Sequence, residues 1–306
     1  MLLAVSDPLT YLQAIVIGIL QGITELFPVS SLGHSVLIPE LFGWHSLVAG
    51  EAADESFYLA FLVGLHVATA IALLIFYRRD WVAVTRGFFT SIRKRSIDTP
   101  PERMAWLLVL GTIPVGIVGL VFEHSLRTVF AKPIAAAIFL TLNGVILLAG
   151  ERLRRNAETR KLVDEHAHHT DPGHDVGRDL DTLELREGVF VGSAQILALF
   201  AGISRSGVTM VAGLLRGLDH EDAARLSFML ATPVILAAGV YKLPDLLGHN
   251  GEHVRGQVLV GSLAAGIAAY LSIRFLTKYF ETRTLTPFAI YSLVFGIAMI
   301  FYTTLS

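Results

Sequence analysis

The sequence contains no cysteine among its 306 residues, and only 16% of the residues are charged. The absence of thiols excludes disulfides, thiolate nucleophiles and cysteine-bound metals. The charged fraction lies well below the roughly 25% of an average soluble domain. No lysine or arginine precedes Arg78, so we expect no cleaved signal peptide at the N-terminus. The formal net charge of −2 gives no reason to expect a nucleic-acid partner.

What the sequence has in abundance is apolar residues, at 53% of the chain with a mean hydropathy of +0.61. About 20 apolar residues in a helix cross the hydrocarbon core of a bilayer. Six segments meet this requirement, namely 57–77, 104–122, 133–150, 224–244, 257–277 and 286–305. The sequence therefore predicts an all-α polytopic membrane protein, with the bilayer as its environment.

Two further apolar regions, 9–43 and 188–218, are each interrupted by a stretch rich in serine and glycine. The stretches are QGITELFPVSSLGHS (Gln21–Ser35) and QILALFAGISRSGVT (Gln195–Thr209), and they align with each other without a gap. A break in the middle leaves two half-length helices that are too short to cross the bilayer. We predict that each region forms a re-entrant helical hairpin.

The order of these elements predicts an internal repeat. Residues 1–150 comprise one hairpin and three spans, residues 188–306 comprise the same set, and residues 151–187 form a charged linker. Three crossings return the chain on the opposite face, so the second repeat has inverted topology. In proteins of this kind the functional site lies near the midplane, where the broken helices meet.

The basic residues support this topology. Nineteen of the 24 lysines and arginines fall in segments that the predicted spans place on one face, four fall on the other face, and Arg205 lies within the second hairpin. Cytoplasmic loops carry the excess of lysine and arginine. We therefore expect both termini and the mouth of the first hairpin on the outer side.

The linker 151–187 contains a group of histidines and aspartates, namely His166, His168, His169, His174, Asp171 and Asp175. Their spacing matches no defined zinc-ligand pattern. The charge-rich composition predicts a solvated, mobile cytoplasmic loop. A metal site is the alternative.

Arg205 is the first candidate for chemistry, because a charged side chain at membrane depth costs about 2.5–3.5 kcal/mol on insertion scales and marks a functional site by default. It lies in GISRSG, among the hydroxyls of Ser204, Ser206 and Thr209. The motif opens a half-helix, whose free amides and positive dipole end favour an anion. We predict a phosphate site. A structural ion pair between Arg205 and a carboxylate is the alternative.

The first hairpin supplies complementary groups. Glu25 lies four residues after Gln21, so the two share a helix face. Its carboxylate is suited to pairing with Arg205, to binding a divalent cation through oxygen or to acid–base chemistry. Its structural alternative is to hold the two hairpins together.

Histidine and serine follow in PVSSLGHS. His34 is flanked by Ser30, Ser31 and Ser35, which makes a serine–histidine nucleophile and base pair available. The alternative for His34 is a hydrogen-bonded core residue. His66, inside the span 57–77, is more consistent with a supporting residue near the site.

The two motifs together resemble those of the bacterial undecaprenyl-diphosphate phosphatases of the bacitracin-resistance family. The family pattern (E/Q)xxxE followed by PVSSxGH resembles Gln21, Glu25 and residues 28–34. The second pattern, PGxSRSxxT, resembles residues 201–209, with Ala201 in place of the usual proline. The resemblance covers nearly the whole chain.

The resemblance implies an enzyme that removes the terminal phosphate of undecaprenyl diphosphate and so recycles the lipid carrier of cell-wall synthesis. It implies a multi-pass protein of the bacterial plasma membrane, an active site open to the periplasm, competition by bacitracin for the lipid substrate and a possible homodimer. It also implies a divalent cation, Mg²⁺ or Ca²⁺, with Glu25 and Gln21 as candidate ligands. The functional positions that carry over are Glu25, Ser31, His34, Ser204, Arg205, Ser206 and Thr209, and Ser30 joins them as a candidate phosphate-binding hydroxyl.

Several alternatives stay open. The nucleophile is either Ser31, with His34 as its base, or His34 itself. A lipid-phosphate transporter or flippase is the main rival, because inverted repeats with broken helices are typical of transporters. A lipid phosphatase of the phosphatidic-acid type is less consistent with the sequence, because its KxxxxxxRP motif is missing.

Overall fold

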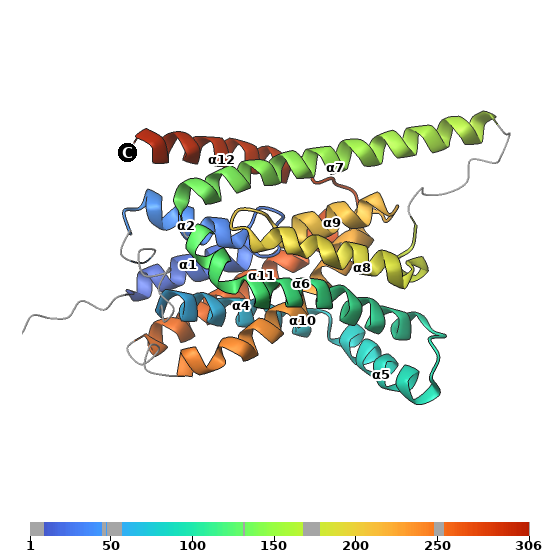
Figure 1. Ribbon diagram of the computed structural model, residues 1–306, viewed down its shortest axis with the longest axis horizontal. Helices are drawn as coiled ribbons and strands as arrows, with labels where there is room; N and C mark the ends of the chain where they lie inside the picture. The colour runs from blue at the N-terminus through green and yellow to red at the C-terminus, as the bar shows by residue number, and fades with distance from the viewer. Residues whose placement is uncertain are drawn as a thin grey trace, which may run out of the picture.

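The computed structural model describes residues 9–44, 47, 57–130, 132–167, 178–247 and 254–305. These residues form helices and no strand, as the sequence predicts (Figure 1). The α-helices are α1 (Tyr11–Thr24), α2 (Ser31–Leu41), α4 (Phe57–Phe76), α5 (Arg78–Lys94), α6 (Pro100–Phe130), α7 (Pro133–Ala167), α8 (Leu185–Ser193), α9 (Arg205–Leu215), α10 (His220–Leu247), α11 (Arg255–Phe280) and α12 (Thr286–Leu305).

Five of these helices are long and apolar enough to cross a bilayer: α10, α11, α12 and the parts of α6 and α7 that comprise Pro100–Phe122 and Pro133–Ala157. Helices α4 and α5 pass the same test only together, and they are bent by 87° at their junction, so the described residues hold five or six candidate spans. Helix α11 has an exposed apolar stripe. It comprises four residues spaced four apart, each at least 60% exposed: Leu259, Leu263, Ile267 and Leu271. These features confirm a polytopic membrane protein.

Each of the two motif regions is broken as predicted. In the first, α1 ends at Thr24 and a turn carries the chain through Pro28 to α2, whose N-cap is Ser30. In the second, α8 passes into the 3₁₀ helix η2 (Ala194–Leu199) before α9 begins, with Ser204 as its N-cap. Both N-cap hydroxyls accept a hydrogen bond from the amide three residues later, which is the usual serine cap.

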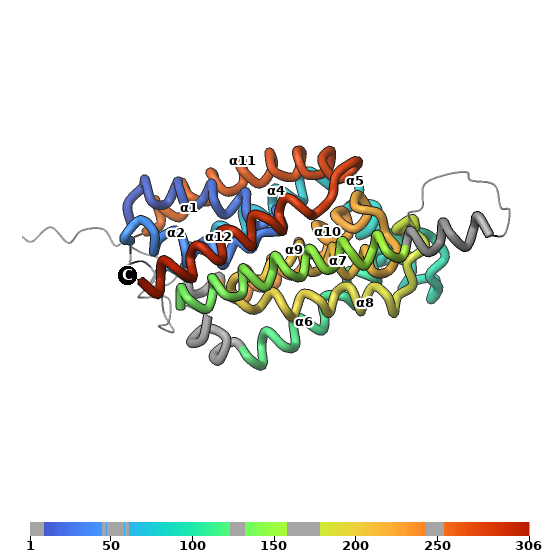
Figure 2. Tube along the Cα trace, turned by 90° about the horizontal axis from the view of Figure 1, so that it is seen from above, coloured from blue at the N-terminus to red at the C-terminus, as the bar shows by residue number. Residues whose placement is uncertain are grey.

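The helices run mostly along the long axis of the molecule (Figures 1 and 2). Helices α1 and α2 lie toward the end where α12 finishes, and α8 and α9 lie toward the opposite end, where α5 lies. The two breaks meet in the middle, at Gly33 and Gly202. A Cβ on Gly33 would lie 2.9 Å from Cα of Gly202, and Gly202 itself adopts φ +112° against the carbonyl of Ala136. Only glycine allows this approach.

Two elements differ from the sequence prediction. The loop expected after the first span is largely the amphipathic helix α5. Helix α7 continues to Ala167, well past the predicted boundary at residue 150. Of the linker histidines, His166 lies in the last turn of α7, where no side chain is described, and His168, His169 and His174 lie outside the described residues.

Candidate active site

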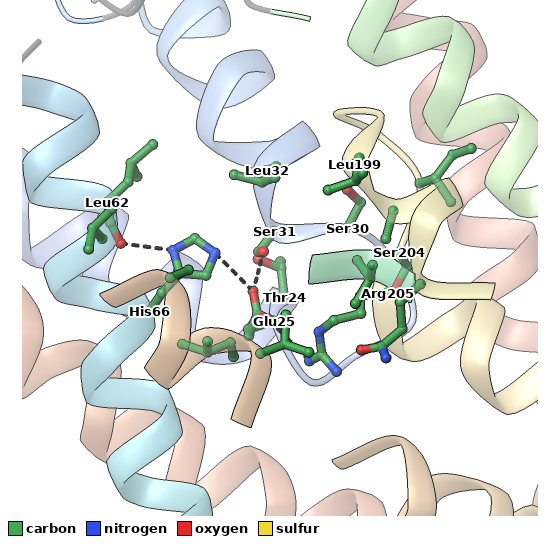
Figure 3. A pocket seen from close by; sticks show the side chains of 18 of the residues that line it. Thr24, Glu25, Ser30, Ser31, Leu32, Leu62, His66, Leu199, Ser204 and Arg205 are labelled. Atoms are coloured by element: carbon green, nitrogen blue, oxygen red, sulfur yellow. Dashed lines mark hydrogen bonds and ion pairs between the residues drawn. The ribbon is translucent and has the colours of Figure 1, made fainter. Parts of the chain in front are cut away.

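A cavity of about 250 Å³ lies where the two hairpin tips meet (Figure 3). One side carries polar residues of the hairpins, and α4, α6, α10 and η2 supply mostly apolar walls. Its polar lining residues are Thr24, Glu25, Ser30, Ser31, His66, Gln195, Ser204 and Arg205. The cavity therefore combines a polar floor with a wall suited to an apolar chain.

Glu25 lies at the centre of the polar floor, in the turn that follows α1, and its side chain is 6% exposed. Its Oε1 accepts a hydrogen bond from Arg205 Nη2 at 3.2 Å. Its Oε2 accepts from Gln21 Nε2 at 3.1 Å and from the Ser31 hydroxyl. His66 Nε2 lies 3.3 Å from the same oxygen. The carboxylate thus joins both hairpins to α4, and it contacts the hydroxyl of Ser31 directly.

Arg205 is the first residue of α9 and lies across the cavity floor from Ser31 (Figure 3). Besides its bond to Glu25, it donates from Nη1 to the carbonyl of Ser227 on α10 at 3.2 Å. Its Nε is buried and has no hydrogen-bond partner among the described residues. The guanidinium is therefore held in place by Glu25 and the Ser227 carbonyl, and its Nε is a buried donor without a partner among those residues.

Two helix N-termini also face the cavity, because Ser31 and Arg205, the first residues of α2 and α9, both line it. The first amides of a helix have no acceptor within the helix, and the N-terminal end carries partial positive charge. Two such ends beside a guanidinium form a site for an anion such as phosphate.

The remaining hydroxyls of the two motifs serve mainly to hold the hairpins. Ser30 Oγ accepts from the amides of Gly33 at 3.2 Å and Gly202 at 3.1 Å, so it joins the two tips. Ser206 Oγ donates to the carbonyl of Phe27, and Thr209 Oγ1 donates to Ser227 Oγ at 2.6 Å. Both of these side chains are fully buried and neither lines the cavity.

His34 also lies away from the cavity. Its Nδ1 lies 2.7 Å from the carbonyl oxygen of Ser30, and its Nε2 lies 2.8 Å from the hydroxyl of Tyr291 on α12. The ring is fully buried and stacks on Tyr291 and Phe295. None of the hydrogen bonds in the described part of the chain joins His34 to Ser31. The structure thus does not assemble the predicted serine–histidine pair.

His66, on α4, is the histidine that lines the cavity in the part of the chain that the structure describes. Its Nδ1 donates to the carbonyl of Leu62 at 2.8 Å, and its Nε2 faces Glu25 (Figure 3). A carbonyl only accepts, so Nδ1 carries a proton, and Nε2 then donates to the carboxylate only in the imidazolium form. The sequence indicated a supporting role for this residue. The only signal for more was an ionisable side chain within an apolar span.

Asn143 on α7 is a site residue that sequence reasoning missed. Its Oδ1 accepts from the amide of Ser204 at 2.9 Å, and its Nδ2 donates to the carbonyl of Pro28 at 3.0 Å and to Ser292 Oγ at 3.2 Å. The fully buried side chain therefore braces both hairpin tips against α7 and α12. A polar amide inside the apolar segment 133–150 was the available signal.

Comparison with known proteins identifies the family of the chain. The family model described as bacitracin resistance protein BacA matches residues 14–298, which include both hairpin tips. The chain belongs to this family. Membership in the BacA family confirms the resemblance seen in the two motifs.

Curated relatives match the chain over nearly its full length. A protein of Frankia alni named undecaprenyl-diphosphatase 2 is 58% identical over 94% of this chain and 96% of its own length. The undecaprenyl-diphosphatase of Mycolicibacterium paratuberculosis is 57% identical over 97% of this chain and 98% of its own length. A second undecaprenyl-diphosphatase 2, from Burkholderia ambifaria, is 43% identical over 92% of both chains.

The cavity of this BacA family member fits a divalent cation only in part. Glu25 is the only carboxylate that lines the cavity, and the described residues contain no group of three His, Asp or Glu side chains that could hold a metal. The side-chain amide of Gln21 contacts Glu25, and its Oε1 is buried without a hydrogen-bond partner in the described part of the chain, but Gln21 does not line the cavity. Mg²⁺ commonly takes one or two carboxylates and completes its coordination with substrate phosphates and water. The residues fit that mode of binding, and they do not form a complete cage.

Proposed function

We propose that the chain is an integral-membrane phosphatase that hydrolyses undecaprenyl diphosphate to undecaprenyl phosphate and inorganic phosphate. The observation that carries this proposal is one cavity in which Ser31 and its hydrogen-bond partner Glu25 face Arg205 and two helix N-termini. The names of the curated relatives point to the same reaction. The product is the lipid carrier in the monophosphate form that cell-wall synthesis uses again.

Substrate binding follows from the two sides of the cavity. The diphosphate lies at the polar floor, where Arg205 and the first amides of α2 and α9 neutralise its charge. The isoprenoid chain lies along the apolar wall, which includes Val115 of α6, Leu199 of η2 and Ile235 of α10. Phosphoryl transfer depends mainly on such positioning and electrostatic stabilisation.

In the reaction, Ser31 Oγ attacks the terminal phosphorus and its proton passes to Glu25. The bond from that phosphorus to the bridging oxygen breaks, and undecaprenyl phosphate leaves. Glu25 gives its proton to the leaving phosphate oxygen and is a carboxylate again. Water then attacks the phosphoserine and passes a proton to Glu25, which gives it to Ser31 Oγ as the bond from Oγ to phosphorus breaks, so inorganic phosphate leaves and both Ser31 and Glu25 are restored. The bound diphosphate draws the Arg205 guanidinium away from Glu25. The carboxylate then loses one of the positive charges that stabilise its ionised form, so Glu25 accepts a proton more readily.

His34 acts in this scheme as a positioning residue. It holds the carbonyl of Ser30 and contacts Tyr291, and it lines no part of the cavity. Ser30 has φ +68°, a conformation that a residue other than glycine rarely adopts. The bond from His34 supports this strained peptide, and with it the start of α2 that carries Ser31. The geometry thus favours Ser31 over His34 as the nucleophile.

A divalent cation, Mg²⁺ or Ca²⁺, belongs to the proposal as a ligand that is shared with the substrate. Glu25 and the free Gln21 Oε1 would hold it, together with oxygens of the diphosphate. Bound there, it would supply positive charge against the developing charge of the phosphoryl group.

For the whole chain we propose six spans and two re-entrant hairpins in an inverted repeat, in the bacterial plasma membrane. The concentration of basic residues at the α5 end supports a cytoplasmic location for that end, with both termini and the mouth of the site on the periplasmic side. Bacitracin would compete for the diphosphate of the substrate. A homodimer stays a prediction.

The test is release of inorganic phosphate from a C55 polyprenyl diphosphate by the purified protein, with and without EDTA. We expect release that EDTA stops, and its loss in Arg205→Ala and in Glu25→Ala. Thr141→Val is the matched control, because the Thr141 hydroxyl bonds only within α7. Full activity in either site variant would contradict the site. A folded protein that binds the lipid and releases no phosphate would support the transporter.

A further inference from the structure

Helix α5 (Arg78–Lys94) has a surface that the phosphatase does not use. It follows α4 directly and is bent from it by 87°. Because α4 runs along the bundle with the spanning helices, α5 lies roughly across that direction, at the end of the molecule where α10 and α12 begin (Figure 1). A helix that leaves a span at a right angle runs parallel to the plane of the bilayer.

The inner face of α5 is fixed against α6. Ser91 Oγ accepts a hydrogen bond from Trp106 Nε1 at 2.9 Å. Gly87 lies so close to the start of α6 that a Cβ there would approach the amide nitrogen of Glu102 to 2.8 Å. Val84 is buried and Phe88 packs on the same core. This packing sets the rotation of α5 and therefore decides which residues point outward.

Two adjacent stripes run along the outward side. The apolar stripe comprises Val82, Phe89 and Ile92, which are 49%, 65% and 50% exposed. The basic stripe comprises Arg79, Arg86 and Arg93, spaced seven residues apart and all exposed. Residues seven apart lie on the same side of a helix.

The charges of the basic stripe are not compensated by the protein. Among the described residues, Arg79, Arg86 and Arg93 have no acidic partner. By contrast, Asp80 pairs with Arg225 at 2.5 Å and Lys94 pairs with Glu102 at 3.4 Å. The unpaired arginines lie beside exposed apolar side chains, which is the pattern of a helix that lies in a membrane interface.

We propose that α5 is an interfacial helix that binds anionic phospholipid headgroups of the adjacent leaflet. The apolar stripe enters the boundary between headgroups and acyl chains, and the basic stripe contacts the lipid phosphates. Basic residues near an anionic leaflet are attracted to its negatively charged headgroups. This inference is independent of the phosphatase reaction.

The absence of cysteine permits a direct test with one spin label per protein. Phe89→Cys places the label in the apolar stripe. Ala83→Cys, which is also exposed, places it on the far side of the arginines. Both proteins are reconstituted in vesicles of phosphatidylcholine alone or with phosphatidylglycerol, and collision of the label with a water-soluble nickel complex is measured. We expect phosphatidylglycerol to reduce nickel collisions at Phe89→Cys and to leave Ala83→Cys unchanged.

Charge variants identify the source of the effect. Combining Arg79→Gln, Arg86→Gln and Arg93→Gln should abolish the phosphatidylglycerol effect at Phe89→Cys. The matched control removes three charges from the end of α11 and the loop that follows it, with Arg274→Gln, Lys278→Gln and Arg283→Gln, and should retain the effect. Equal nickel collisions at the two labelled positions in phosphatidylglycerol vesicles would overturn the proposal, and would leave the stripe available to a soluble partner. Persistence of the lipid effect in the α5 triple variant would overturn it as well.

Discussion

Glu25 is the residue on which the polar floor of the cavity depends, because Arg205, His66, Ser31 and Gln21 all meet its two oxygens. When His66 is an imidazolium, two of these partners are cationic, and the floor then has more positive than negative charge. Such an excess favours a substrate that brings its own anionic group. The neighbouring Ser31 hydroxyl and the Nε of Arg205, which has no partner among the described residues, support a functional role for this ion pair beside its structural one.

The first residue-scale prediction concerns His34 and its partner Tyr291. We expect His34→Ala and Tyr291→Phe to lower kcat, because each loosens the Ser30 peptide and misplaces Ser31. His34→Gln should restore part of the activity, since an amide is able to donate to the Ser30 carbonyl. The measurements are kcat, KM and thermal stability for each variant and for the double variant His34→Ala with Tyr291→Phe.

A positioning role and a catalytic role for His34 differ in the pH profile. If His34 only positions Ser31, His34→Gln should keep the wild-type shape of kcat/KM against pH at a lower level. The effects of His34→Ala and Tyr291→Phe should be less than additive, because both act through the same contact. Loss of one limb of the pH profile in His34→Gln would instead assign proton transfer to His34.

At the scale of elements, the site depends on the meeting of two short helices that the spans must hold in place. The close approach of Gly33 and Gly202 lets the tips touch, and Ser30 joins them by hydrogen bonds to both glycine amides. Asn143 then attaches the tips to α7. The half-helices are too short to be stable alone, so their orientation is imposed by this packing.

Asn143 provides the element-scale prediction. Asn143→Leu removes the bonds to Pro28, Ser204 and Ser292 and leaves buried backbone groups without partners, each at a cost of about 1–3 kcal/mol. We expect a lower unfolding temperature in detergent and a large loss of phosphate release. Thr141→Val, two residues earlier on α7 and on another side of the helix, should change neither. Wild-type activity in Asn143→Leu would show that the brace is dispensable.

At the scale of the whole molecule, opposite ends of the bundle carry different groups. The end that includes α5 also holds the start of α10 and ion pairs such as Arg178 with Glu187 at 2.8 Å. The Arg178 guanidinium and the amide of Glu184 lower the pKa of Glu187, so this carboxylate stays charged at neutral pH. The opposite end, where α12 finishes, has few basic residues in the part that the structure describes, chiefly Lys132, Lys242 and Arg255. This asymmetry is the basis of the proposed orientation.

Orientation is tested with the same cysteine-free background. Thr304→Cys lies near the end of α12, and Asp98→Cys lies between α5 and α6; both positions are exposed. In intact cells, a membrane-impermeant maleimide should label Thr304→Cys, and should label Asp98→Cys only after the cells are opened. A permeant maleimide, which should label both, is the control. The reverse pattern would contradict the orientation.

The sequence by itself determined the membrane class, the positions of the long helices, the two breaks and the residues Glu25, Ser31 and Arg205, because hydropathy, helix breakers and motif spacing are local properties of a chain. The right-angle bend before α5 and the continuation of α7 into the linker were not anticipated, because hydropathy locates the spans and not the helical turns that follow them. Only the tertiary structure decided that His66 faces Glu25 while His34 turns toward Tyr291, and that Asn143 braces both tips. Those contacts join residues far apart in sequence. A rotation of a helix by about 100°, the step from one residue to the next, separates a side chain that lines a cavity from one that is buried behind it.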